Sequence, residues 1–198
     1  MTLVVGITGG IGAGKSTLTE RLIKKGYFVY DSDYEVGELY KAPKHEFVEF
    51  LKKIGLNNSI EKNKINKKTI AEIIFSHEKT KNKLEEYIHK NLKKKREMFI
   101  KNHKKLKTKI IFLDVPLLFE KKLENKFQKI ISVISTKETR YKRIQKNKNF
   151  SKIIFNRILK KQTNDKTRRK KSDFIIINNS SKNKYIKKID KILERLGR

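Results

Sequence analysis

The sequence of 198 residues contains no cysteine. Without cysteine, the chain cannot form disulfides, thiolate metal sites or a cysteine nucleophile. No apolar run approaches the roughly 18 residues that a membrane span needs, so we expect none. The N-terminus also lacks a basic segment followed by a long apolar stretch, so we expect no signal peptide and a cytoplasmic protein.

Acidic residues are few: 21 Asp and Glu stand against 51 Lys and Arg, which gives a net charge of +30. Such a charge is typical of proteins that bind nucleic acid or another polyanion. However, the basic residues are mostly lysines scattered among Asn and Ile, a pattern that an AT-rich genome also produces. Arginine-rich clusters with interleaved aromatic residues, which favour nucleic-acid recognition, are absent. We therefore expect general attraction of anionic ligands and no specific nucleic-acid partner.

Five short apolar runs are predicted to form strands, at residues 2–8, 27–30, 109–114, 129–135 and 174–178. Their continuous apolar character indicates strands that are buried on both faces, as in a parallel sheet. Segments with helical spacing lie between them. The predicted fold class is therefore α/β, with a five-stranded parallel sheet. The length and the lack of repeats favour a single domain over residues 1–198.

The first helix is predicted to begin near Lys15, with Leu18, Leu22 and Ile23 on one apolar face and Gly26 at its end. Residues 34–107 contain no convincing buried strand. Apolar residues at helical spacing predict an inserted helical region there. The core of the fold is then expected to comprise three segments, residues 1–33, 108–146 and 169–198.

A glycine-rich stretch joins the first predicted strand to the first predicted helix. Its residues 9–16 (GGIGAGKS) fit the pattern G-x-x-x-x-G-K-[ST]. Backbone N–H groups of such a loop surround phosphate oxygens, and the helix N-terminus adds partial positive charge. Lys15 can reach the β and γ phosphates, and the Ser16 hydroxyl is placed to bind Mg²⁺. A glycine-rich turn without a ligand, or a dinucleotide fingerprint, fits the stretch less well.

Acidic residues follow two of the predicted strands. Asp31 and Asp33 come after the second strand, and Asp114 ends the third. Because ligands bind at the carboxyl ends of parallel strands, these carboxylates are candidates for the same site. Asp31 or Asp33 could accept a proton from a hydroxyl group or hold a Mg²⁺-bound water, and Asp114 could hold Mg²⁺ through a water. The alternative is that all three are turn or helix-capping residues.

Four blocks of the sequence together point to one enzyme family. They are TGGIGAGKST at residues 8–17, VYDSD at 29–33, DVPLLFE at 114–120 and SDFIIINN at 172–179. In content and order they resemble the dephospho-coenzyme A kinase family, over nearly the whole chain. The resemblance implies a P-loop NTPase core like that of nucleoside-monophosphate kinases. It also implies that the helical region at 34–107 binds the coenzyme A moiety and that residues 147–168 form a lid.

The resemblance further implies transfer of the γ-phosphoryl group of ATP to the ribose 3′-hydroxyl of dephospho-coenzyme A, with Mg²⁺. ATP and dephospho-coenzyme A are then the small-molecule partners, and we expect a monomer or a weak homo-oligomer. In family terms, Asp33 matches the base, and Lys15 and Arg143 spread the transition-state charge. His89 and Asp114 join Asp33 at the substrate. The expected ATP-binding residues are Gly10, Gly12, Ala13, Gly14, Lys15, Ser16 and Thr17.

The sequence departs from the family pattern in the lid. Asn147 and Lys148 stand where the family usually has an arginine and an acid. We expect Lys146, Lys148, Arg157 or Arg168 to supply the missing charge, although lysine cannot make the planar bidentate contact of arginine.

Two other functions remain open. One is a P-loop kinase of another nucleoside or nucleotide acceptor. The other is a basic nucleic-acid-binding protein with a vestigial nucleotide site, using the lysine-rich stretches at residues 93–109 and 166–171.

Overall fold

The computed structural model describes residues 1–61, 64–145 and 151–197. It divides the chain into two compact units. The sheet unit consists of Met1–Asp31 with Asn102–Arg198, and the helical unit consists of Ser32–Lys101. Among the described residues, no helix combines the length and the apolar composition that a membrane span requires.

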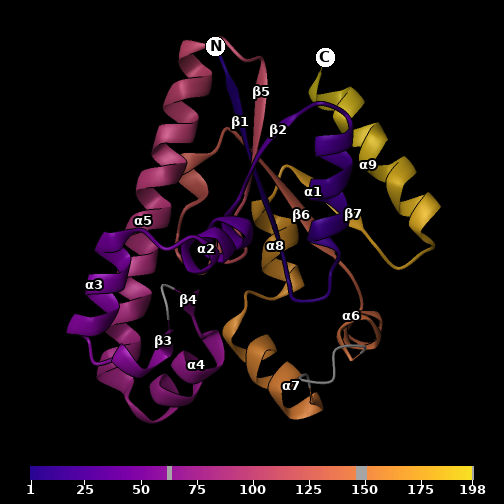
Figure 1. The fold of residues 1–198 in the computed structure, drawn as a ribbon. Coiled ribbons are helices and arrows are strands. Elements are labelled where there is room, and N and C mark those ends of the chain that lie inside the picture. Colours follow the sequence, from indigo (N-terminus) through magenta and orange to yellow (C-terminus); the bar gives the residue numbers. More distant parts are fainter. Residues whose placement is uncertain (62–63, 146–150, 198) are drawn as a thin grey trace. The chain divides into compact units, whose positions relative to one another are not determined.

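The sheet unit is built on five strands in the order β2-β5-β1-β6-β7, and every neighbouring pair is parallel (Figure 1). The strands are β1 (Leu3–Gly9), β2 (Phe28–Asp31), β5 (Ile110–Asp114), β6 (Lys129–Ile134) and β7 (Phe174–Ile177). The predicted five-stranded parallel α/β fold is therefore confirmed. Since β1 lies at the centre, the loop that follows it emerges from the middle of the carboxyl edge.

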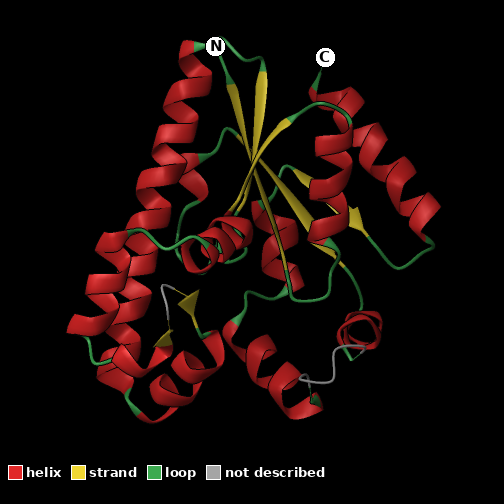
Figure 2. Cartoon of the chain, viewed as in Figure 1, coloured by secondary structure: helices red, strands yellow, loops and turns green. Residues whose placement is uncertain are grey.

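In Figure 2 the strands of the sheet unit are coloured yellow, and its helices are coloured red. They are α1 (Lys15–Lys24), α6 (Lys137–Ile144), α7 (Lys152–Lys161), α8 (Asp165–Lys171) and α9 (Lys182–Leu196), with a short 3-10 helix at Glu124–Lys126. Apolar side chains of α1 and α9, among them Leu22 and Ile189, pack with Val5 and Ile7 of β1 in one core cluster. Gly6, between these two strand residues, faces the other side, where Leu118 and Phe127 leave no room for a Cβ.

Of the three apolar residues predicted to form the buried face of α1, two are buried. Leu18 and Leu22 are fully buried, but the prediction for Ile23 is wrong, because its side chain is 58% exposed. Residues four apart lie on the same side of a helix, whereas the next residue is rotated by about 100°. Only the stripe through Leu18 and Leu22 therefore faces the sheet.

The helical unit has its own apolar cluster. Its helices are α2 (Ser32–Lys41), α3 (His45–Lys53), α4 (Lys67–Ser76) and α5 (Glu78–Lys105), the last of which continues beyond the unit, with a 3-10 turn at Asn57–Ser59. Phe47 and Leu51 of α3, Leu56, Ile70 of α4 and Leu84 of α5 form the buried cluster. The structure also contains a two-stranded antiparallel sheet, β3 (Ile60–Glu61) and β4 (Lys64–Ile65), where no strand was predicted. Strands of two residues are too short to show a sequence period.

Replacing Leu18 by alanine removes a fully buried side chain and leaves a cavity between α1 and the sheet. We expect Leu18→Ala to lower the free energy of unfolding by about 2–5 kcal/mol. Ile23→Ala on the same helix is the matched control and should change it by less than about 0.5 kcal/mol. Urea denaturation of both variants measures the difference, and equal losses would show that the described packing of α1 is incorrect.

Candidate active site

The glycine-rich loop between β1 and α1 has a backbone that only glycine adopts readily. Gly12 has φ 71° and Gly14 has φ 105°, both in the left-handed region. Space is also restricted. A Cβ at Gly10 would lie 2.1 Å from Nη2 of Arg140, and one at Gly14 would lie 2.3 Å from Nδ2 of Asn178. Gly10 is therefore required by the Arg140 side chain beside it, Gly12 by its backbone conformation, and Gly14 by both its conformation and the Asn178 side chain.

The carbonyl oxygens of four consecutive loop residues, 11–14, all accept hydrogen bonds from side chains. Arg140 of α6 donates through Nε to the carbonyl of residue 11 at 2.8 Å. Arg143 of the same helix donates through Nη1 to the carbonyls of residues 12 and 13, at 3.3 Å each. Asn178 donates to the carbonyl of residue 13 at 2.8 Å, and the Tyr185 hydroxyl donates to that of residue 14 at 3.0 Å. The loop is thus held by its carbonyl groups.

The backbone N–H groups of the loop differ from one another: those of Ile11 and Ala13 have acceptors, whereas four others in the described structure do not. Within the described part of the chain, those of Gly12, Gly14, Lys15 and Ser16 have no hydrogen-bond acceptor. A run of N–H groups without acceptors at a helix N-terminus is suited to an anion with several oxygens. This arrangement fits the predicted phosphate site.

Three of the anchoring side chains are buried, those of Arg140, Asn178 and Tyr185. Burial raises the pKa of the Tyr185 hydroxyl above its ordinary value, so this group remains protonated and able to donate near neutral pH. Burial lowers the pKa of the Arg140 guanidinium, but an arginine starts so high that it stays charged. Arg143 uses its second terminal nitrogen, Nη2, to bind the carbonyl and side-chain oxygens of Asn178. Both terminal nitrogens of Arg143 therefore bind the protein, which favours a positioning role.

Two carboxylates lie at the carboxyl edge of the sheet. Asp31 of β2 and Asp114 of β5 are opposite each other in register. Asp114 is buried and accepts a hydrogen bond from the Thr19 hydroxyl of α1 at 3.3 Å. The Ser16 side chain, one turn earlier on α1, is exposed.

The carboxylate of Asp114 and the hydroxyl of Ser16 are oxygen ligands of the kind that bind Mg²⁺ in proteins when most of its other ligands are waters and phosphate oxygens. The described residues contain no cluster of three or more His, Cys, Asp or Glu side chains that could hold a metal by themselves. The donor set around Ser16 and Asp114 therefore fits a magnesium ion that arrives with a nucleotide, rather than one bound by the protein alone.

The remaining predicted substrate residues belong to the helical unit. Asp33 lies in the first turn of α2, and His89 lies on α5; both residues are exposed. The structure thus assigns Lys15, Ser16 and Asp114 to one unit, and Asp33 and His89 to the other.

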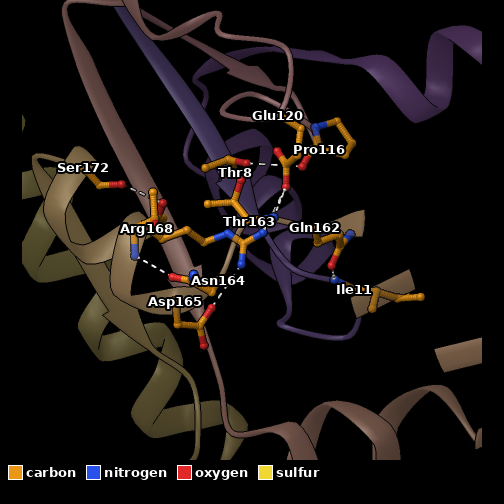
Figure 3. A network of polar contacts seen from close by, with 12 residues as sticks. Thr8, Ile11, Pro116, Glu120, Gln162, Thr163, Asn164, Asp165, Arg168 and Ser172 are labelled. Carbon is orange, nitrogen blue, oxygen red and sulfur yellow. Dashed lines mark hydrogen bonds and ion pairs between the residues drawn. The ribbon is translucent and has the colours of Figure 1, made fainter. Parts of the chain in front are cut away.

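Arg168 does not supply an exposed charge to the lid, and that expectation is wrong. Its side chain is 1% exposed and forms ion pairs with Asp165 at 3.1 Å and Glu120 at 3.4 Å (Figure 3). Glu120 also accepts the backbone N–H of Thr163 at 2.6 Å. A buried charge needs such partners, so Arg168 joins α8 to the segment after β5. Of the other candidates, Arg157 is exposed on α7, whereas Lys146, Asn147 and Lys148 lie outside the described residues.

The sequence did not reveal the anchoring roles of Arg140, Asn178 and Tyr185. Asn178 stood in a block shared with the family, but the block gave no indication that its side chain binds the loop. Burial of a polar side chain in an α/β core is the signal that could have identified them, but it requires the fold.

Comparisons with known proteins agree with one another. A family model described as dephospho-CoA kinase matches residues 3–184. The chain is similar to a dephospho-CoA kinase of Fusobacterium nucleatum, with 34% identity over 98% of each chain. It is also similar to the solved structure of a dephospho-CoA kinase from Campylobacter jejuni, with 27% identity, a TM-score of 0.75 and coverage of 99% and 98%. A shikimate kinase from Acinetobacter baumannii shares the fold alone, with 15% identity, a TM-score of 0.53 and coverage of 99% and 93%.

Gly14→Ala should damage the loop more than an equivalent change elsewhere. Its Cβ would displace Asn178 and break the bond to the carbonyl of residue 13, besides straining a positive φ. Gly26→Ala is the matched control, because Gly26 has φ 80° but open space around its Cβ. We expect both variants to lose about 1 kcal/mol or more of stability. Only Gly14→Ala should also weaken binding of a fluorescent ATP analogue; equal affinities would contradict the described loop packing.

Proposed function

The chain belongs to the dephospho-CoA kinase family, and on that basis we propose that it transfers the γ-phosphoryl group of ATP to the ribose 3′-hydroxyl of dephospho-CoA, the last step of coenzyme A biosynthesis. The observation that carries the donor half of this proposal is the loop at residues 11–14, whose carbonyls are all bound by side chains. The N–H groups of Gly12, Gly14, Lys15 and Ser16, which have no acceptor in the described structure, can bind the phosphates of ATP. The reaction consumes ATP, and we assign the enzyme to the cytoplasm.

In the proposed site, Lys15 follows the loop and reaches the β and γ phosphates. Ser16 and, through a water, Asp114 would hold Mg²⁺. When bound, that ion would supply positive charge that offsets the charge developing on the phosphates. Arg143 keeps the loop carbonyls in place, and its own charge favours an anionic ligand nearby.

Asp33 is the proposed general base for the acceptor hydroxyl. Its carboxylate is exposed in the first turn of α2, where a substrate can reach it. Asp31 differs, because it is part of β2 and in register with Asp114. We assign Asp31 to the magnesium-bound water and Asp33 to proton transfer, so that the two neighbouring acids have separate roles.

The helical unit is proposed to hold the coenzyme A moiety, with His89 on α5 among the contacts. Its own apolar cluster gives it a core independent of the sheet. The net charge of +30 attracts both anionic substrates over a distance of about one Debye length. We propose a monomer or a weak homo-oligomer with no specific nucleic-acid partner.

The proposal is tested by an ATP-coupled assay with dephospho-CoA and a panel of other acceptors, including adenosine, a nucleoside monophosphate and shikimate. We expect turnover with dephospho-CoA far above the ATPase blank and little with the other acceptors. Folded protein that turns over another acceptor faster, or none at all, would overturn the assignment.

Asp33→Asn removes the proposed base and keeps the size of the side chain. We expect kcat to fall by about 10²–10⁴-fold with unchanged affinity for ATP, because the loop at residues 11–14 is untouched. Asp31→Asn is the control, and at saturating Mg²⁺ it should retain most of kcat. If Asp33→Asn keeps a nearly wild-type kcat, Asp33 is not the base.

A further inference from the structure

Ile11, the first residue of the loop turn, is bound on both sides of its backbone by the same pair of side chains. Its N–H donates to Oε1 of Gln162 at 3.0 Å (Figure 3), and its carbonyl accepts from Nε of Arg140 at 2.8 Å. Nη2 of Arg140 also donates to the same Oε1 at 3.2 Å. These three hydrogen bonds form a closed ring, which we term the Ile11 clamp. Its members are the side chains of Gln162 and Arg140 and the two peptide groups of Ile11.

The two clamp residues come from segments of the sheet unit outside the loop. Arg140 is 6% exposed, and the absence of a Cβ at Gly10 makes room for its guanidinium. Gln162 is the residue that ends α7, where its own N–H binds the carbonyls of Ile158 and Leu159. The next N–H along the chain, that of Thr163, binds Glu120. Arg140 and Gln162 therefore belong to α6 and to the C-cap of α7, outside the loop that they bind.

We propose that Gln162 and Arg140 are positioning residues for the phosphate loop: by binding both peptide groups of Ile11, they hold the empty loop in the conformation that binds ATP. This inference rests on the proposed function and extends it, because it assigns to the C-terminal end of α7 a role in ATP affinity. Two of the three bonds are donated by a charged guanidinium, which makes them stronger than neutral ones.

The physical reason is preorganisation. A glycine-rich loop has many accessible conformations in the free protein, and ligand affinity falls in proportion to the fraction of molecules in the binding conformation. The clamp restricts the first residue of the turn before ATP arrives, while the N–H groups of Gly12, Gly14, Lys15 and Ser16 remain without acceptors in the described structure. Loss of the clamp should therefore weaken ATP binding and leave the chemical step in the filled site nearly unchanged.

The test is Gln162→Leu, which keeps the approximate size of the side chain and removes the shared acceptor. Gln128→Leu is the matched control, because Oε1 of Gln128 accepts the N–H of Val4 at 2.9 Å, at the opposite end of β1. We expect both variants to melt at lower temperature. Gln162→Leu alone should raise the Kd for Mg·ATP, measured by calorimetry without acceptor, by about five- to tenfold. In turnover, the KM for ATP should rise by a similar factor, with kcat within about twofold.

Gln162→Glu should rescue the affinity, since a carboxylate oxygen still accepts from both Ile11 and Arg140. Arg140→Lys changes the other side chain of the clamp. It should also raise the Kd for Mg·ATP, because lysine lacks the planar guanidinium that donates to both Ile11 and Gln162. If Gln162→Leu, or Arg140→Lys, binds Mg·ATP as tightly as the wild type, the inference is wrong and the clamp is only structural. Calorimetry needs no acceptor, so a protein that binds ATP but fails to phosphorylate dephospho-CoA would refute the proposed function and not the clamp.

Discussion

The structure depends on one arrangement of hydrogen bonds, in which side chains bind the carbonyl groups of residues 11–14. A peptide group with its carbonyl held toward the protein directs its N–H elsewhere, so binding these carbonyls also sets the direction of the N–H groups. Arg140, Arg143, Asn178 and Tyr185 make these contacts. They come from α6, from the residue after β7 and from α9, so most of the sheet unit contributes to the shape of one loop.

This arrangement explains why buried charge is placed beside a loop that binds anions. Unpaired buried carbonyls are unfavourable, and arginine can satisfy several of them with one rigid group. Its charge then adds to the positive end of α1 behind the phosphate site. A second buried arginine also pairs with acceptors from another segment: Arg168 of α8 forms an ion pair with Glu120, in the segment that follows β5.

The sequence predicted those features that depend on local patterns. Five apolar runs gave the five strands, and the spacing of Lys15 and Ser16 after the glycines gave the loop, because both follow from properties of consecutive residues. Ile23 was assigned to the core incorrectly, since the width of a buried stripe depends on what packs against it. The start of α2 was likewise ambiguous, because Asp-Ser-Asp suits a turn as well as a helix N-terminus.

The anchoring contacts could not be predicted for a different reason. Tyr185 follows Gly14 by 171 residues, and Gln162 follows Ile11 by 151. Such pairs are determined by sheet order, which no local pattern encodes. Tyr185 is buried on α9, but no neighbouring residue in the sequence indicates that its hydroxyl binds the loop. Arg168 was a candidate for the missing charge of the lid and is instead buried between two carboxylates, for the same reason.

The most direct test of the whole account is the identity of the phosphorylated product. Phosphorus NMR of a reaction containing the protein, Mg²⁺, ATP and dephospho-CoA shows which atom receives the phosphoryl group and how much ATP is consumed. The account predicts one ribose 3′-phosphate for each ADP formed. Inorganic phosphate in place of that product, or a phosphoryl group on another position, would contradict it.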